Sequence, residues 1–132
     1  MDKSASCICC SGRPFGDCCE PLLSGRDRAR TPRQLMRSRY AAYALGGYGD
    51  YLRETWHPSS PNHPGLADLE GADHAWQRLD ILQSDQKGNS GVVEFRAVWL
   101  DDDGTEQVHH EHSLFLRVKG RWYYLKGEFP DE

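Results

Sequence analysis

Residues 7–19 read Cys-Ile-Cys-Cys-Ser-Gly-Arg-Pro-Phe-Gly-Asp-Cys-Cys and contain all five cysteines of this 132-residue chain. Cys7 and Cys9 form one pair, Cys18 and Cys19 form a second pair, and turn-forming residues lie between them. Two pairs of thiolates that face each other across a short loop match the ligand set of a tetrahedral zinc ion. The spacing therefore predicts a structural zinc knuckle near the start of the chain.

Two other interpretations of these cysteines compete with a zinc site. Disulfide bonds would leave one thiol of the five unpaired, and a bond between the adjacent Cys18 and Cys19 would be strained. A redox-active Cys-x-x-Cys site normally begins a helix after a strand, and this stretch has neither flank. The N-terminus is polar and lacks the apolar segment of a secretory signal, which indicates a reducing cytoplasm. We therefore expect a cytoplasmic protein that binds zinc.

The same residues resemble the SEC-C motif, the small zinc module found at the C-terminus of the bacterial preprotein translocase motor and in many other proteins. The usual form of that motif is Cys-Pro-Cys-Gly-Ser-Gly, then an aromatic residue, then Cys-Cys or Cys-His. By position, the resemblance implies that the zinc ligands are Cys7, Cys9, Cys18 and Cys19. It also implies that Phe15 is the hydrophobic anchor of the knuckle. Ile8 replaces the usual proline and Cys10 the usual glycine, so a fifth thiol lies beside the site.

Length and composition indicate one modest domain with a small appendage. We divide the chain into the zinc-binding motif, residues 1–25, and an α+β domain, residues 26–132. No run approaches the roughly 20 apolar residues that a membrane-spanning helix needs, so we expect no contact with a membrane.

Charge is distributed unevenly along the chain. Residues 1–40 carry eight Lys and Arg against four Asp and Glu, whereas the remaining residues carry eight against sixteen. A basic segment of this kind allows an association with nucleic acid, the ribosome or an acidic partner, although a solvated helix face is the commoner explanation. The arginines concerned are Arg26, Arg28, Arg30, Arg33, Arg37 and Arg39.

Helices are predicted in the first half of the domain. Residues 31–34, Thr-Pro-Arg-Gln, combine an N-cap, a proline at the first helical position and a capping box. They predict a helix over 32–45, which the following two glycines should end. A shorter helix fits residues 48–56, and the proline-rich residues 57–65 should form a loop.

From Ala75 onward the pattern changes to the alternation that is typical of strands. The predicted strands begin at Ala75 and then cover residues 92–100, 107–118 and 121–129, with tight turns before the last two. Helices followed by a four-stranded meander indicate an α+β fold, in which the helix over 32–45 covers one face of the sheet. A curved antiparallel sheet wrapped on helices makes a cone with an open mouth, and this plan is similar to the nuclear-transport-factor-like (cystatin-like) fold.

Taken with the N-terminal motif, nearly the whole chain resembles the YchJ-like family of bacterial proteins. The matching stretches are residues 37–43, 55–58, 93–97, 110–115 and 120–124. This resemblance implies the cone fold with a zinc knuckle, and it implies no particular activity.

The strand over 107–118 carries the residues that bear on enzymatic chemistry. Alternation places Glu111 and Ser113 on one face with His109, and places His110 and His112 on the other face. On a concave face, Glu111 would be a carboxylate with a raised pKa, suited to proton abstraction.

Each of these residues also has a simpler explanation. Glu111 can be a structural carboxylate bonded to Arg96, Tyr40 or Tyr43, and two histidines two residues apart can lie on an exposed face instead of binding a metal. Trp56 and His57 can complete the mouth of a pocket or close it. The candidate pocket residues are Tyr40, Trp56, His57, Glu111 and Ser113. Among the other aromatic residues, Trp99, Trp122 and Tyr124 are expected in the core.

The sequence therefore favours a bacterial zinc-binding protein that acts as a binding or adaptor module, with a protein partner at the knuckle. The first alternative is a small-molecule enzyme of the isomerase or hydrolase kind that uses Glu111 and a histidine in the cone. The second alternative is a nucleic-acid-associated or ribosome-associated protein that uses the arginine-rich segment.

Overall fold

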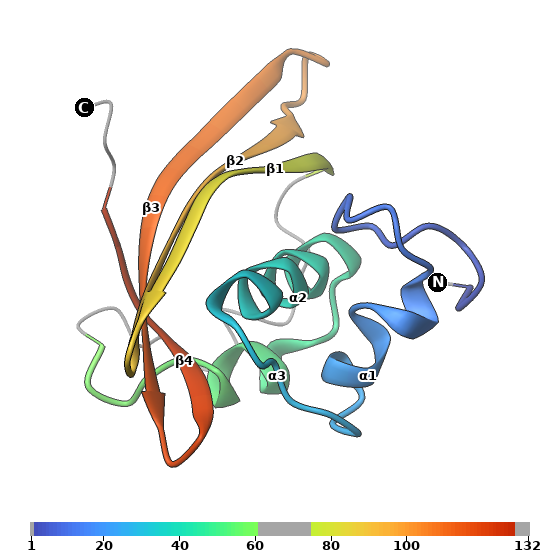
Figure 1. Ribbon diagram of the computed structural model, residues 1–132. Helices are drawn as coiled ribbons and strands as arrows, with labels where there is room; N and C mark the ends of the chain where they lie inside the picture. The colour runs from blue at the N-terminus through green and yellow to red at the C-terminus, as the bar shows by residue number, and fades with distance from the viewer. Residues whose placement is uncertain (1, 61–74, 129–132) are drawn as a thin grey trace.

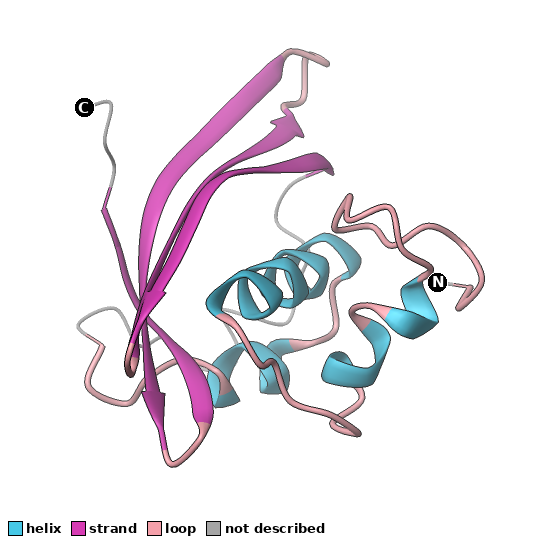
Figure 2. Ribbon diagram, in the orientation of Figure 1, coloured by secondary structure: helices cyan, strands magenta, loops and turns pink. Residues whose placement is uncertain are grey.

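The computed structural model describes residues 2–60 and 75–128 of the chain. Helices come first along the chain and strands follow, as Figure 2 shows. In order, the elements are η1 Phe15–Asp17, α1 Glu20–Leu23, α2 Pro32–Leu45, α3 Gly49–Glu54, β1 Ala75–Lys87, β2 Ser90–Leu100, β3 Glu106–Val118 and β4 Arg121–Glu128. Figure 1 shows α2 between the curved sheet and the cysteine-rich N-terminal segment. The α+β architecture confirms the fold class that the sequence predicted.

Helix α2 forms where its capping residues predicted it. The Thr31 side chain accepts a hydrogen bond from the Gln34 backbone N–H at 3.1 Å. The Gln34 side chain accepts from the Arg30 N–H at 2.7 Å and not from that of Thr31, so the expected reciprocal capping box is displaced by one residue. The helix ends at Gly46, whose φ of 75° suits glycine.

Strands β1 to β4 pair in chain order as an antiparallel meander in the described part of the chain. Along β2, Val93, Phe95 and Ala97 are buried against α2 while Arg96 between them is exposed, which is the predicted alternation. At the start of β2, a Cβ on Gly91 would collide with the ring of Pro32. The start of α2 therefore lies directly on the sheet.

Two predictions about burial were wrong. Arg39 was assigned to a solvated, basic helix face, but it is 2% exposed and faces the sheet. Trp99 and Tyr124 were placed in the core and are only half-buried, because they line a cavity between α2 and the sheet. Trp122 is buried as predicted, and its indole N–H donates to the Arg30 carbonyl at 3.2 Å.

The structure does not test some predictions about the organisation of the chain. The proposed loop over 57–65 and the end of the last strand at residue 129 reach outside the described residues. The division of the chain at residue 25 remains a prediction. Among the described helices, none combines the length and the apolar character needed to cross a bilayer.

Candidate metal centre and cone pocket

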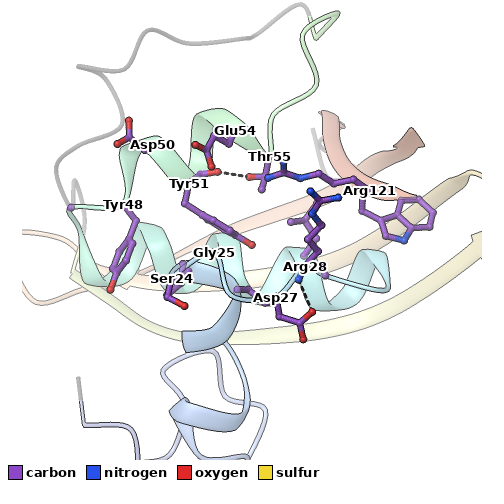
Figure 3. A pocket seen from close by; sticks show the side chains of 16 residues that line it. Ser24, Gly25, Asp27, Arg28, Tyr48, Asp50, Tyr51, Glu54, Thr55 and Arg121 are labelled. Carbon is purple, nitrogen blue, oxygen red and sulfur yellow. Dashed lines mark hydrogen bonds between the residues drawn. The ribbon is translucent and has the colours of Figure 1, made fainter. Parts of the chain in front are cut away.

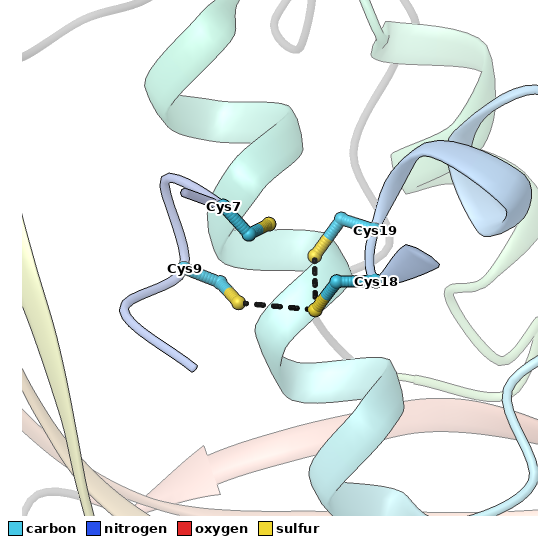
Figure 4. Close-up of side chains that lie close together, drawn as sticks. All are labelled: Cys7, Cys9, Cys18 and Cys19. Carbon is cyan, nitrogen blue, oxygen red and sulfur yellow. Dashed lines mark hydrogen bonds between the residues drawn. The ribbon is translucent and has the colours of Figure 1, made fainter. Parts of the chain in front are cut away.

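Four of the five cysteines converge in front of α2, as Figure 4 shows. The sulfur atoms of Cys7, Cys9, Cys18 and Cys19 all lie within 4.8 Å of one another. The Cys9 and Cys18 sulfurs are 3.6 Å apart, and those of Cys18 and Cys19 are 4.0 Å apart. These separations are far longer than a disulfide of about 2.05 Å, so the thiols are free. The cluster has the donors and the spacing to bind a metal ion.

Tight local turns bring the two cysteine pairs together. The Cys7 N–H donates to the Arg13 carbonyl at 2.8 Å, and the Cys18 N–H donates to that of Phe15 at 3.1 Å. Phe15 is buried beneath the loop, in the position expected of a hydrophobic anchor. Cys10 has a φ of 67°, the left-handed conformation for which glycine is the usual residue, and its exposed thiol lies outside the cluster.

The four thiols of the cluster resist ionising together when no cation lies between them. Contacts with Cys19 and Cys7 lower the pKa of Cys9, whereas contacts with Cys7 and Cys9 raise the pKa of Cys19. The sulfurs thus share little negative charge among themselves, because each thiolate disfavours ionisation of its neighbours. A bound cation would allow all four thiols to ionise.

Arginine side chains surround the cluster. Arg37 on α2 donates from Nη1 to the Cys9 carbonyl at 2.7 Å and so fastens the knuckle to the helix. Beside this contact is a groove of about 360 Å³. Its charged lining residues are Arg13, Arg28, Arg30, Arg33, Arg37, Asp17 and Asp27. We call this the basic groove. Arg39, the other arginine of the predicted basic segment on α2, cannot contribute because it faces the sheet.

A second site lies in the cone, between α2 and the sheet. This cone cavity has a volume of about 380 Å³. It is lined by Met36, Arg39, Tyr40, Tyr43, Trp56, Trp76, Phe95, Ala97, Trp99, His109, Glu111 and Tyr124. Of the predicted pocket residues, Tyr40, Trp56 and Glu111 are in this lining, and Ser113 supports Glu111 from behind it.

Glu111 is bonded by residues of β3 and β4. Its Oε1 lies 2.7 Å from Nε2 of His109, and its Oε2 accepts from Ser113 at 2.6 Å and from Tyr124 at 2.9 Å. Burial alone would raise the pKa of Glu111, but these hydrogen bonds outweigh it and lower the pKa below the ordinary value of 4.5. The expected raised pKa was wrong, and of the expected partners, Arg96 and Tyr40 form no bond to this carboxylate. A carboxylate of this kind holds its neighbours in place and is a poor proton acceptor.

Arg39 is the second charged group in the cone wall. Its Nη1 donates to the Leu52 carbonyl at 2.8 Å and to the Thr55 hydroxyl at 2.6 Å. Its guanidinium lies 4.7 Å from the ring centre of Trp56 and 4.8 Å from that of Tyr124. Burial lowers the pKa of Arg39, yet arginine stays charged in proteins. Sequence reasoning missed this residue because an arginine on a helix is usually exposed.

His57, a predicted pocket residue, is not among the residues that line the cone cavity. Its ring meets that of Tyr123 edge-on at 5.8 Å, and its Nδ1 accepts from the Ser59 N–H at 3.0 Å. The histidines on the other face of β3 each lie against a carboxylate: His110 is 2.7 Å from Glu94, and His112 is 3.7 Å from Glu128. Among residues 2–60 and 75–128, the four cysteines form the one group of three or more metal-ligating side chains.

A third pocket, of about 520 Å³, opens between α1, α3 and the start of β4. Figure 3 shows the side chains of Arg28 and Arg121 near each other in its wall, and Asp27, Asp50 and Glu54 also line it. Charges of both signs therefore line this pocket. Sequence reasoning did not predict this pocket, because its walls come from segments far apart in the chain.

Known proteins resemble this chain over nearly its full length. The model of the YchJ middle NTF2-like domain matches residues 31–127. A UPF0225 protein of Vibrio vulnificus is 39% identical over 134 aligned positions, which cover 98% of this chain and 78% of that protein. A UPF0225 protein of Deinococcus radiodurans is 42% identical over 120 positions, covering 90% of this chain and 85% of that protein.

Two solved structures share the fold. The solution structure of a SEC-C motif containing protein from Rhodopseudomonas palustris is 41% identical, has a TM-score of 0.88, and matches over 96% of this chain and 100% of its own. A putative calcium/calmodulin dependent protein kinase II association domain from Xanthomonas campestris matches with a TM-score of 0.51 over 80% of this chain and 96% of its own. At 13% identity, that second likeness concerns the fold alone. The family model, the curated relatives and the cysteine cluster together show that this chain belongs to the YchJ-like family of bacterial proteins with an NTF2-like domain.

Proposed function

We propose that the four clustered cysteines hold a structural Zn²⁺ ion and that the zinc-bearing knuckle is the docking surface of an adaptor protein. A tetrahedral zinc ion with Zn–S bonds of about 2.3 Å requires sulfurs about 3.8 Å apart. The separations of 3.6 Å and 4.0 Å within the cluster support this ion. Four protein sulfurs fill its coordination shell, so zinc would contribute folding energy here and would leave no position for water or substrate.

Native mass spectrometry tests the zinc proposal. Wild-type protein purified with its thiols reduced should carry one zinc ion, and so should Cys10→Ser, because Cys10 lies outside the cluster. Cys9→Ser should lose the ion or bind it far more weakly. The proposal fails if the wild-type protein carries no zinc, or if Cys10→Ser loses zinc as readily as Cys9→Ser.

The basic groove supports the docking role. Among the described residues, no carboxylate forms an ion pair with Arg13, Arg28, Arg30 or Arg33, and all four side chains are exposed. Guanidinium groups that form no ion pair with a carboxylate of the same chain favour an acidic ligand. They surround the knuckle, so a partner bound in the groove would contact the knuckle and the start of α2 together.

The size of the net charge favours an acidic protein segment over nucleic acid. Five arginines against two aspartates leave three positive charges in the groove lining. A zinc ion with four thiolates carries a charge of −2, which offsets two of them. A net charge of about +1 suits a few carboxylates on a short peptide better than the continuous charge of a phosphate backbone, with its steep salt dependence.

Fluorescence anisotropy with a labelled oligoglutamate peptide tests this choice. Zinc-loaded protein should bind the peptide more tightly than an oligonucleotide of equal charge. The double variant Arg30→Glu/Arg33→Glu should abolish peptide binding, whereas Arg78→Glu on the outer strand β1 should not. Tighter binding of the oligonucleotide would refute the adaptor proposal and favour the nucleic-acid alternative.

A further inference from the structure

The pocket between α1, α3 and the start of β4 contains two arginine side chains that lack a carboxylate partner. Arg28 comes from the segment between α1 and α2, Arg121 comes from β4, and Figure 3 shows them near each other in the wall. In the part of the chain that the structure describes, no carboxylate forms an ion pair with either guanidinium. Two like charges repel each other unless an anion lies between them, and the planar edge of a guanidinium suits a carboxylate. The pair therefore offers a place for an anionic group.

Arg121 is held in this wall by aromatic side chains. It is half-buried, and its guanidinium lies 5.6 Å from the ring centre of Tyr123. On the other side is Tyr51, which also lines the pocket and whose hydroxyl is bonded to that of Ser38 at 2.6 Å. Burial raises the pKa of Tyr51, and the nearby charge of Arg121 opposes this rise. Arg121 is thus positioned before any ligand arrives, which lowers the entropic cost of binding one.

Helix α3 contributes charges of the opposite sign to the same pocket. Asp50 and Glu54 both line it, and residues four apart lie on one side of a helix. No basic side chain of the described residues forms an ion pair with either carboxylate. The arginines and the acidic residues of this pocket therefore do not neutralise one another directly. A ligand that is only anionic would be attracted at the arginines and repelled at α3, whereas a zwitterion would be attracted at both.

Apolar side chains complete the pocket. Those in its lining that are buried include Leu22, Leu23, Leu35 and Trp122. A volume of about 520 Å³ admits a small organic molecule, and apolar walls favour one with an apolar part. We propose that this pocket binds a free α-amino acid with an apolar side chain, its carboxylate at Arg28 and Arg121 and its ammonium group toward the carboxylates of α3. Arg28 also lines the basic groove, but Arg121 and the two acidic residues of α3 do not, so this site does not depend on the adaptor function.

Titration of the zinc-loaded protein with L-leucine, followed by backbone amide signals in two-dimensional NMR, tests this assignment. The signals of Ser24, Gly25 and residues 48–55 should shift, because these segments surround the pocket. Leucinamide, which lacks the carboxylate, should bind at least about ten-fold more weakly than leucine. N-acetylleucine, which lacks the ammonium group, should bind about five-fold more weakly, since the carboxylates of α3 are exposed. Absence of binding, equal binding of the three compounds, or shifts confined to the basic groove would overturn the proposal.

Two charge-removing variants assign each end of the ligand. Arg121→Gln should weaken leucine binding about ten-fold and leave the affinity for leucinamide unchanged, because leucinamide has no carboxylate to lose a contact. Glu54→Gln should weaken leucine binding and leave the affinity for N-acetylleucine unchanged for the corresponding reason. Unchanged affinity for one compound also shows that each variant is folded. Arg78→Gln and Glu106→Gln, an exposed pair outside the pocket lining, are the matched controls and should bind leucine as the wild type does. If Arg121→Gln binds leucine with unchanged affinity, the guanidinium is not part of the site and the proposal fails.

Discussion

Replacing Gly127 by alanine should disrupt the hydrogen bonds that hold Glu111 in the cone wall. Gly127 on β4 pairs with Ser113 on β3. A Cβ at this position would collide with the Glu111 carboxylate and lie 2.8 Å from the Tyr124 hydroxyl. The φ of Gly127 is not positive, so alanine suits the backbone, and the collision is the whole of the expected effect. The carboxylate would have to move and would lose its bonds to Ser113 and Tyr124.

The cost follows from those two bonds. A hydrogen bond to a charged group contributes about 1.5–3 kcal/mol, and two would be lost. Against this, alanine reduces the entropy of the unfolded chain, which stabilises the protein by about 0.4–1 kcal/mol. Gly127→Ala should therefore lower the free energy of unfolding by about 2–5 kcal/mol, which a domain of ordinary stability can survive.

A double-mutant cycle isolates the contact from other effects of the substitution. In a Glu111→Ala background the carboxylate is gone, so adding Gly127→Ala should change the free energy of unfolding by less than about 1 kcal/mol. Urea unfolding of the zinc-loaded proteins, followed by tryptophan fluorescence, gives all four values. If Gly127→Ala costs as much in the Glu111→Ala background as in the wild type, the collision with Glu111 is not its cause and the reasoning is wrong.

Three further perturbations address the zinc knuckle, the pH dependence of stability, and Arg37 and Arg39 of α2. Removal of zinc with a chelator should disorder residues 1–25 and leave the sheet intact, so that amide signals of the strands persist in NMR spectra while those of the knuckle collapse. Because its pKa is lowered in the folded state, ionised Glu111 stabilises the protein fully above about pH 4.5, and this stabilisation is lost as the pH falls through the folded-state pKa. The difference in the free energy of unfolding between the wild type and Glu111→Gln should therefore shrink below about pH 4.5. A constant difference down to the acid transition would contradict this. Arg37→Met should speed the loss of zinc to a chelator with little change in the stability of the sheet. Arg39→Met should instead lower the free energy of unfolding by about 2–4 kcal/mol and leave the rate of zinc loss unchanged. If the two variants behave alike, the assignment of Arg37 and Arg39 to opposite faces of α2 is wrong.

Local rules predicted the long helix and the order of the strands, although the predicted helix over 48–56 is shorter in the structure, Gly49–Glu54. Thr31 and Gly46 determine where α2 begins and ends, and alternation in β2 and β3 determines which side chains face inward. For the same reason the sequence placed Glu111 and Ser113 on one face, which is buried. These features depend on residues within a few positions of one another, and such dependence is visible in a sequence.

The glycine beneath the Glu111 carboxylate depends on a feature that the sequence does not display. The β3–β4 pairing shifts by one residue between Leu114 and Phe115. Such a shift moves every later side chain of β4 to the opposite face, which places Gly127 under the Glu111 carboxylate. A regular hairpin would have put Lys126 there. The same dependence on tertiary structure explains Arg39, whose hydrogen-bond acceptors come from Leu52 and Thr55 and whose covering rings include Tyr124 of β4.

Helix α2 joins the two sites because it forms a wall of each. Arg37 points from it to the Cys9 carbonyl, and Arg39 and Tyr40 point from it into the cone cavity. Successive residues of a helix differ by about 100° in direction, so residues 37 and 39 must face opposite sides. One helix can therefore use an arginine to hold the knuckle and a second arginine to line the cavity without either interfering with the other. For that reason loss of the metal should release the knuckle while the cone, whose wall is held by the sheet and by α3, keeps its shape.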